Sequence, residues 1–367
     1  MASSRQIYQP IHPDFLVKLL PEYVEFHNAN TAFFPAVHQV PWDPAVRKGA
    51  PVMGGSEPLK VGNVKDVPLS KCTMRIFTPE GTAPAEGWPV FLFFHGGQSY
   101  LFQAWFAGLI TTAGGWTLGN VDTENAFSTN MCKHASCVVV SVDYRLGPEE
   151  PYPAAVEDAE EALHWVYTQG KAQLGVNVNK IAVGGSSSGG NLAAIVTHKA
   201  ALASPPIALT FQLLVVPVVD NTASPSGVPY ASWIENANTP SLVPEKMIWY
   251  RQQYSPNEAD WTKWDNSPIF APEEAFKKSP PAWIAIAELD ILRDEALAYA
   301  EKLKKAGVEV ETKIYKGSPH PIMAMDGMVL LIYSLSLTDL FYSGWDSPTI
   351  RLVSDAAEAL KKAFESL

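Results

Sequence analysis

Basic segments are absent from this sequence of 367 residues, in which 27 Lys and Arg stand against 38 Asp and Glu. The formal net charge of -11, without any run of Lys or Arg, argues against nucleic acid and against an anionic membrane surface as partners. Long apolar runs are absent too. A bilayer span needs roughly 18 to 20 apolar residues, and the nearest candidate, which begins at Met328, is broken by Ser, Thr and Asp. We predict no nucleic-acid partner and no membrane span.

Metal and cofactor motifs are also missing. The three cysteines, Cys72, Cys132 and Cys137, form no C-x-x-C pair, and the histidines form no H-E-x-x-H pattern. No G-x-G-x-x-G opens the first strand-helix unit, which argues against a dinucleotide. The first residues lack the charged and apolar regions of a secretory signal. We therefore expect a cytoplasmic protein without metal or cofactor, whose chemistry comes from side chains.

What the sequence does contain is an alternation of apolar strand-like runs with helical segments. With 47% hydrophobic residues, the chain can bury one large core. Strands rich in Val, Ile and Phe that alternate with helices are typical of a parallel sheet covered on both faces. The predicted strands lie in "PVFLFFHGG", "CVVVSVDYR", "KIAVGG", "TFQLLVVPVVD", "PAWIAIAELD" and "VEVETKIYKG", and the predicted helices cover Ala154 to Gln169 and follow Gly190 and Asp294.

Two segments depart from this alternation. The N-terminal stretch has apolar residues at helical spacing interrupted by Pro21, which indicates broken amphipathic helices. Between Asp220 and Pro280 the chain becomes aromatic and Pro-rich. We interpret about 1–50 and 221–275 as a small helical cap over the carboxyl edge of the sheet, on a single domain that spans 1–367. For any single Trp of the second segment, ordinary core packing is the better interpretation.

A nucleophile is predicted in "KIAVGGSSSGGNLAA", where Gly-Ser-Ser-Ser-Gly stands between a strand and a helix. This is the G-x-S-x-G pattern in the context it requires: the turn exposes the hydroxyl above the sheet, and the helix N-terminus favours negative charge. Three consecutive serines leave the register to be decided. Only Ser187 has a Gly two residues away on each side, at Gly185 and Gly189, so we predict Ser187 as the nucleophile.

The acid and the base that a serine nucleophile needs follow in the order Ser, Asp, His. Asp290 comes just after the strand "WIAIA", and His320 just after the next strand. Loops at the carboxyl edge of a parallel sheet carry function. Either residue alone has a plainer interpretation, Asp290 as a helix N-cap and His320 as a surface loop histidine. Taken together, they predict a catalytic triad of Ser187, Asp290 and His320.

These motifs together resemble the hormone-sensitive-lipase-like carboxylesterases of the α/β-hydrolase fold. The resemblance extends over most of the chain and rests on "FHGG", "VDYRLGPEEPYPAAVEDAEEAL", "GSSSGGNLAA", "AELDILRDEA" and "GSPHPIMAM". It implies an α/β fold with a mostly parallel central sheet, helices on both faces and a small cap. It further implies a serine esterase that acts on short-chain acyl esters of small molecules, and it suggests an acetyl ester of a fungal secondary metabolite.

The same resemblance implies an oxyanion hole made of the backbone N–H groups of Gly96, Gly97 and Ser188. His95 and the block Asp143 to Glu149 are interpreted as scaffolding of the loops. Members of the family read His-Gly-Gly-Gly-Trp, whereas here "HGG" and Gly115-Trp116 are separated by Gln98 to Gly114. A second apolar addition covers about 328–345. Both are either genuine insertions or translated introns, and the resemblance favours introns.

A second function stays open beside the esterase. A catalytically impaired or non-catalytic small-molecule-binding member of the same fold would share most of these motifs. Loss of the histidine would favour that alternative, and His320 is present.

Overall fold

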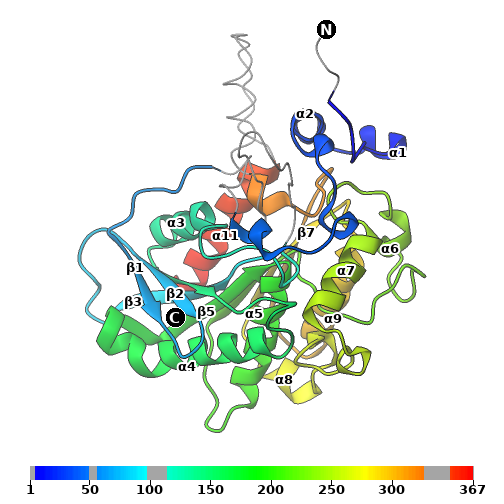
Figure 1. Ribbon diagram of the computed structural model, residues 1–367. Coiled ribbons are helices and arrows are strands. Elements are labelled where there is room, and N and C mark those ends of the chain that lie inside the picture. The colour runs from blue at the N-terminus through cyan, green and yellow to red at the C-terminus, as the bar shows by residue number, and fades with distance from the viewer. Residues whose placement is uncertain (1–4, 49–55, 97–113, 326–347, 367) are drawn as a thin grey trace.

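The computed structural model describes residues 5–48, 56–96, 114–325 and 348–366 (Figure 1). The two predicted insertions, 98–114 and about 328–345, lie outside the described residues except for Gly114.

An eight-stranded sheet forms the centre of the molecule, in the order β1-β2-β4-β3-β5-β6-β7-β8. The first two strands pair antiparallel, as do β2 and β4, and all other pairs are parallel. The mostly parallel sheet predicted from the sequence is thus confirmed. The strands are β1 (Asn63–Pro68), β2 (Thr73–Thr78), β3 (Trp88–Phe94), β4 (Val138–Asp143), β5 (Val176–Ser186), β6 (Phe211–Val215), β7 (Ala282–Ala287) and β8 (Val310–Tyr315).

The strand-helix alternation of the sequence did not predict β1 and β2. The edge strand β1 is exposed along most of its length and carries no apolar run. Strand β2 mixes buried with half-buried residues: Met74, Ile76 and Phe77 are buried, whereas its other residues are half-buried. Neither segment contains the continuous apolar run that is typical of a strand buried on both faces.

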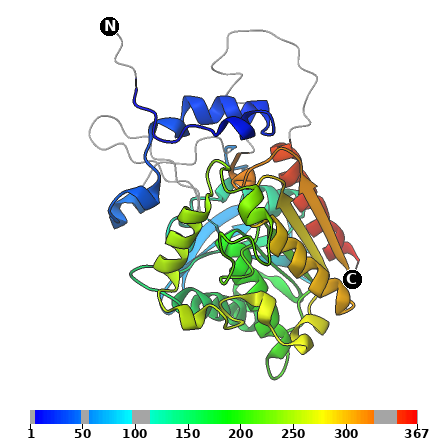
Figure 2. The same cartoon turned by 90° about the vertical axis from the view of Figure 1, so that its right-hand side faces the viewer.

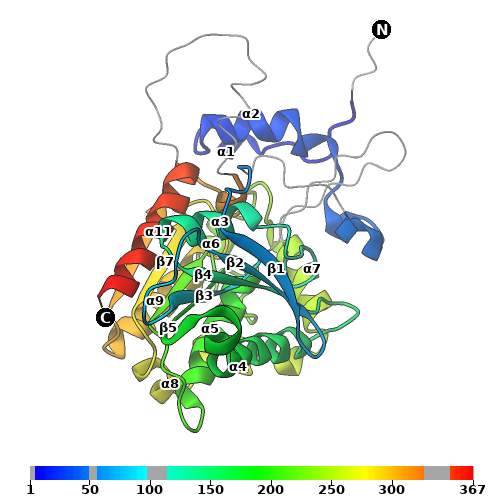
Figure 3. The same ribbon diagram turned by 90° about the vertical axis from the view of Figure 1, so that its left-hand side faces the viewer.

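Helices cover both faces of the sheet, as predicted. Along β3, Val90, Leu92 and Phe94 join a core with α4 (Ala154–Leu174), α5 (Ser188–Leu202) and α9 (Arg293–Lys305). The alternate residues Phe91 and Phe93 join a second core with α3 (Asn125–His134) and α11 (Pro348–Glu365). Figure 3 shows α3 and α11 on the opposite side of the sheet from α4 and α5. Within the described ranges, no helix is both long and apolar enough to cross a membrane.

The N-terminal helices lie beyond one end of the sheet (Figures 1 and 2). These are α1 (Pro13–Leu16) and α2 (Pro21–Ala29), separated at Pro21 as the sequence predicted. They contact the second predicted cap segment through a 2.9 Å hydrogen bond between the Tyr23 hydroxyl and Ser241 Oγ. They also pack on Leu289, directly before Asp290. The second segment contains α6 (Ser232–Glu235) and α7 (Pro244–Tyr254), and α8 (Glu273–Lys277) follows at its end.

Candidate active site

Ser187 lies on a sharp turn between β5 and α5. Its backbone has φ 52° and ψ -114°, a region that residues with a side chain rarely occupy. Space decides which residues flank it. A Cβ on Gly185 would stand 2.3 Å from the Gly189 carbonyl, and one on Gly189 would stand 2.0 Å from the Phe94 carbonyl oxygen. Only glycine fits at these positions, which is why the Gly-x-Ser-x-Gly spacing marks the middle serine. Helix α5 begins at Ser188, not after Gly190 as predicted, because Gly189 and Gly190 belong to its first turn.

The structure brings Ser187, His320 and Asp290 into one hydrogen-bonded chain. The His320 Nε2 lies 2.9 Å from Ser187 Oγ, and its Nδ1 lies 2.6 Å from Asp290 Oδ2. The acid and the base are almost fully buried, with 1% and 3% of their surfaces exposed. Burial of a carboxylate is costly unless hydrogen bonds compensate. Besides His320, Asp290 accepts the Leu292 N–H at 3.0 Å, which holds the carboxylate in place.

The three residues lie together because each follows the carboxyl end of a strand. Ser187 follows β5, Asp290 follows β7 and His320 follows β8, and these strands run parallel. Their carboxyl ends therefore share one edge of the sheet, where the three loops converge. The arrangement can transfer a proton from the Ser187 hydroxyl to His320 while Asp290 stabilises the imidazolium.

The flanking serines have other partners. Ser186 Oγ donates a hydrogen bond to Glu124 Oε1 at 2.7 Å, and Ser188 Oγ donates to the Gly96 carbonyl at 3.3 Å. Among the three serines, Ser187 is the one whose hydroxyl contacts His320. The contacts of the neighbouring hydroxyls thus support the register chosen from the sequence.

The predicted oxyanion donors are placed unevenly. Ser188 is the first residue of α5, and the first N–H groups of a helix have no acceptor within the helix. The Gly96 N–H, in contrast, lies 3.3 Å from both carboxylate oxygens of Glu124. This amide already has an acceptor within the protein, which differs from the donor role expected from the sequence. Gly97 lies outside the described residues.

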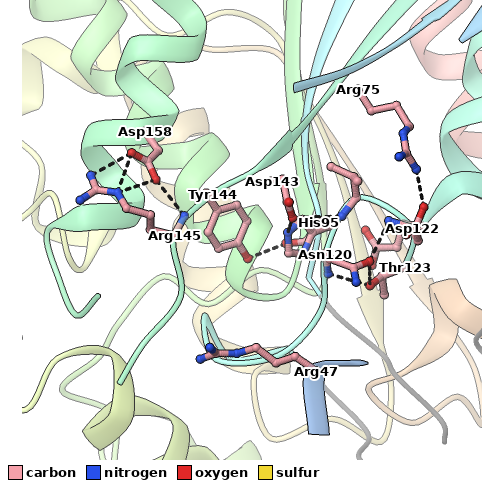
Figure 4. Close-up of polar contacts among 12 residues, drawn as sticks. Arg47, Arg75, His95, Asn120, Asp122, Thr123, Asp143, Tyr144, Arg145 and Asp158 are labelled. Atoms are coloured by element: carbon pink, nitrogen blue, oxygen red, sulfur yellow. Dashed lines mark hydrogen bonds and ion pairs between the residues drawn. The ribbon is translucent and has the colours of Figure 1, made fainter. Parts of the chain in front are cut away.

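His95 is a packing residue of the loop after β3. Its ring stacks on Tyr144 at 4.4 Å between centroids, and the Tyr144 hydroxyl donates to the His95 carbonyl at 2.7 Å (Figure 4). The nearest carboxylate, that of Asp143, is 4.0 Å from Nε2. Burial lowers the pKa of His95 to about 4, against a smaller opposing contribution from the Gly96 backbone. A buried imidazole that stays neutral fits the scaffolding role predicted for it.

Arg145 anchors the turn after β4. Its guanidinium contacts Asp158, a fully buried acid of α4, at 2.8 Å (Figure 4). It also contacts Glu157 and Glu150. The Asp158 carboxylate accepts the Arg145 backbone N–H as well, at 2.8 Å. These contacts hold the "DYRLGPEE" block as scaffolding, in agreement with the interpretation of the sequence.

Arg47 has a structural role for which the sequence contains no recognisable motif. Its Nε donates to the Thr117 carbonyl at 2.8 Å, and one terminal nitrogen contacts the Gly147 carbonyl and the Glu149 carboxylate, each at 2.6 Å. The N-terminal segment is thereby tied to the turn that contains Trp116, whose buried ring stacks on Tyr254 at 4.2 Å. A single arginine in a Pro-rich stretch has no local signature, because its partners are distant in sequence.

No group of three or more His, Cys, Asp or Glu side chains suited to a metal ion occurs in the part of the chain that the structure describes. The absence of a metal and of a cofactor from the mature enzyme stays a prediction of the sequence.

Comparison with known proteins gives three findings. The α/β-hydrolase fold family matches residues 110–324. A protein of the AB hydrolase superfamily from Schizosaccharomyces pombe is 47% identical over 334 residues, which cover 87% of this chain and 92% of that protein. The ethyl acetate hydrolase of Pseudomonas putida is 30% identical over 271 residues, or 71% of this chain and 77% of that enzyme.

Solved structures agree with these sequence matches. The crystal structure of an esterase from Pyrobaculum calidifontis superposes with a TM-score of 0.68 at 30% identity, covering 83% of this chain and 86% of that one.

Proposed function

Since this chain belongs to the α/β-hydrolase family, we propose that it is a serine carboxylesterase that hydrolyses short-chain acyl esters of small molecules through an acyl-serine intermediate. The observation that carries the proposal is the hydrogen-bonded chain from Ser187 Oγ through His320 to Asp290. The named activities of related enzymes, carboxylesterases among them, support the same reaction.

Acylation begins with His320 neutral and its proton on Nδ1, donated to Asp290. Ser187 Oγ attacks the ester carbonyl carbon while its proton passes to Nε2 over the 2.9 Å contact. Asp290 stabilises the imidazolium that forms. The resulting tetrahedral intermediate collapses when Nε2 returns the proton to the leaving alcohol, which leaves an acyl ester on Ser187.

Deacylation repeats these steps with water as the nucleophile. His320 takes a proton from water, and the carboxylic acid leaves as Ser187 regains its hydrogen. In both halves of the reaction an oxyanion develops beside the N-terminus of α5, where the Ser188 N–H and the helix dipole favour negative charge. We propose Ser188 as one oxyanion donor, with Gly97 as the second expected from the sequence.

The cap proposal rests on the contacts between its two parts. Residues 8–13, 27, 36, 38 and 39 of the N-terminal segment and residues 238–241, 243, 245 and 246 of the second segment line one cavity of about 630 Å³. The Tyr23–Ser241 hydrogen bond joins the same two parts. We propose that this cap borders the path of a small ester to Ser187. Within the proposed class, acetyl esters are favoured because one relative is named an ethyl acetate hydrolase. The acetyl ester of a secondary metabolite rests on the family resemblance alone.

Hydrolysis of p-nitrophenyl esters tests the function. We expect the purified protein to hydrolyse the acetate and butyrate faster than long-chain esters. Ser187→Ala should lower kcat by about 10⁴ to 10⁶, because triad members act as a unit.

Ser186→Ala is the matched control: it removes a neighbouring hydroxyl that contacts Glu124 and not His320, and it should keep more than about a tenth of the parent kcat. A fluorophosphonate should label the parent on the peptide that contains Ser187 and leave Ser187→Ala unlabelled. Full activity of Ser187→Ala would contradict the assignment. A parent protein that binds short esters without hydrolysing them would favour the non-catalytic alternative.

A further inference from the structure

A buried carboxylate, that of Glu124, lies between the loop after β3 and the nucleophile turn. It belongs to the residue that precedes α3 and is 7% exposed. Its Oε1 accepts the Ser186 hydroxyl at 2.7 Å, and both of its oxygens lie 3.3 Å from the Gly96 N–H. The carboxylate therefore joins the residue before the nucleophile to the loop that faces it.

The peptide unit between His95 and Gly96 is held at both ends. Its carbonyl oxygen accepts the Tyr144 hydroxyl at 2.7 Å, and its N–H points to Glu124. Since a peptide unit is planar and rigid, two such contacts fix its orientation. The next carbonyl, that of Gly96, accepts Ser188 Oγ at 3.3 Å.

Close packing makes this orientation matter for the reaction. A Cβ on Gly96 would stand 2.4 Å from Ser186 Oγ and 2.7 Å from the Ser186 carbonyl oxygen, so the backbones of the loop and of the nucleophile turn lie in close contact. A rotation of the His95–Gly96 peptide would therefore displace the backbone on which Ser187 and Ser188 stand. Misplacement of catalytic groups by about 1 Å can cost about 10² in rate.

We propose that Glu124 is a positioning residue of the esterase site, which fixes the Gly96 peptide against the Ser187 turn by accepting hydrogen bonds from Gly96 and Ser186. This inference rests on the proposed esterase function. Glu124 accepts a hydrogen bond in both contacts and directs the Gly96 N–H away from a donor role, so that oxyanion stabilisation falls to other N–H groups, that of Ser188 among them.

Kinetics of three variants test the proposal. Glu124→Ala should lower kcat for p-nitrophenyl acetate about 10- to 100-fold, with KM changed less than about threefold, because substrate binding does not use the carboxylate. Glu124→Gln should stay within about threefold of the parent, since its amide oxygen can occupy the Oε1 position and accept both donors. The matched control is Asp122→Ala, an exposed acid of the same segment that pairs with Arg75 (Figure 4), and it should match the parent.

Comparison of kcat in the single and double variants distinguishes a positioning role of Glu124 from a general loss of structure. Ser186→Ala removes one of the two donors and should lower kcat less than about tenfold. The double variant Glu124→Ala/Ser186→Ala should be no slower than Glu124→Ala alone, because both changes break one shared contact. Full kcat in Glu124→Ala, or a Glu124→Gln variant as slow as Glu124→Ala, would overturn the proposal while the esterase function stands.

Amide exchange gives a measure that needs no ester. In ¹⁵N-labelled protein the Gly96 N–H should exchange with solvent at least about tenfold faster in Glu124→Ala than in the parent, and Glu124→Gln should keep its protection. If Glu124→Ala does not fold, the comparison is made between Ser186→Ala, Glu124→Gln and the parent. Equal protection in Glu124→Ala would refute the contact, and it would do so even if the parent hydrolysed no ester.

Discussion

Two loops at the same edge of the sheet each present a buried histidine, and the two imidazoles have different partners. In the loop after β8, His320 lies between Asp290 at 2.6 Å and Ser187 at 2.9 Å. In the loop after β3, His95 stacks on Tyr144, and its nearest carboxylate is 4.0 Å away. Burial is common to both. The partners at the ring nitrogens make one histidine suited to proton transfer and the other to packing.

The largest expected difference between the two histidine loops is in kcat, when the carboxylate nearest to each histidine is replaced by an amide. We expect Asp290→Asn to lower kcat by about 10⁴, because the amide no longer stabilises the imidazolium or selects the useful tautomer. Asp143→Asn is the matched change beside His95, and it should alter kcat less than about threefold. Steady-state kinetics with p-nitrophenyl acetate measure both. Equal losses in the two variants would mean that His95 also takes part in proton transfer.

Burial of the His95 imidazole without a carboxylate partner should make the folded protein less stable at acid pH. The pKa of His95 is lowered to about 4, so the folded protein keeps this imidazole neutral where the unfolded chain, at about 6.5, binds a proton. The unfolded state then gains stability as the pH falls below about 6.5, and the folded state loses stability until about pH 4. His198, buried with its pKa lowered to about 3, acts in the same direction.

His95→Phe should remove the part of this acid-induced loss of stability that His95 causes. Between pH 6.5 and pH 4.5, two pH units correspond to about 3 kcal/mol in the free energy of unfolding. Urea denaturation at pH 7 and pH 4.5 measures the change, with His164→Gln, an exposed histidine of α4, as control. The same acid-induced loss in His95→Phe and in the parent would contradict the assignment of a neutral, desolvated ring.

The smallest expected effect is the change in esterase activity when the insertion after the His95 loop is deleted. Both histidine loops continue into a predicted insertion, and removal of 98–114 joins "HGG" to Gly115-Trp116. We predict that this deletion yields a folded protein with esterase activity raised at least about tenfold, part of what one aligned oxyanion donor contributes. Kinetics of the purified deletion variant decide the point, together with sequencing of the transcript across these codons. A folded but less active variant would show that the segment is a genuine working insertion.

Local patterns were sufficient for the parts of the site that depend on backbone geometry. The glycines around Ser187 could be identified because no other residue fits the turn, and Asp290 and His320 could be predicted because each follows a predicted strand of the parallel sheet. Strands β1 and β2 gave no comparable signal. They lie toward the edge of the sheet, where partial exposure replaces the apolar run.

The sequence by itself determined the α/β architecture and was sufficient to predict Ser187, Asp290 and His320 as candidate nucleophile, acid and base, because the pattern around each of them is carried by residues close together in the chain. The tertiary structure decided the partners of those residues. Only folding brings Glu124 to Gly96 and Ser186, or Arg47 to the Thr117 and Gly147 carbonyls. A hydrogen bond between groups tens of residues apart depends on how the strands are ordered in the sheet, and no local spacing encodes that order.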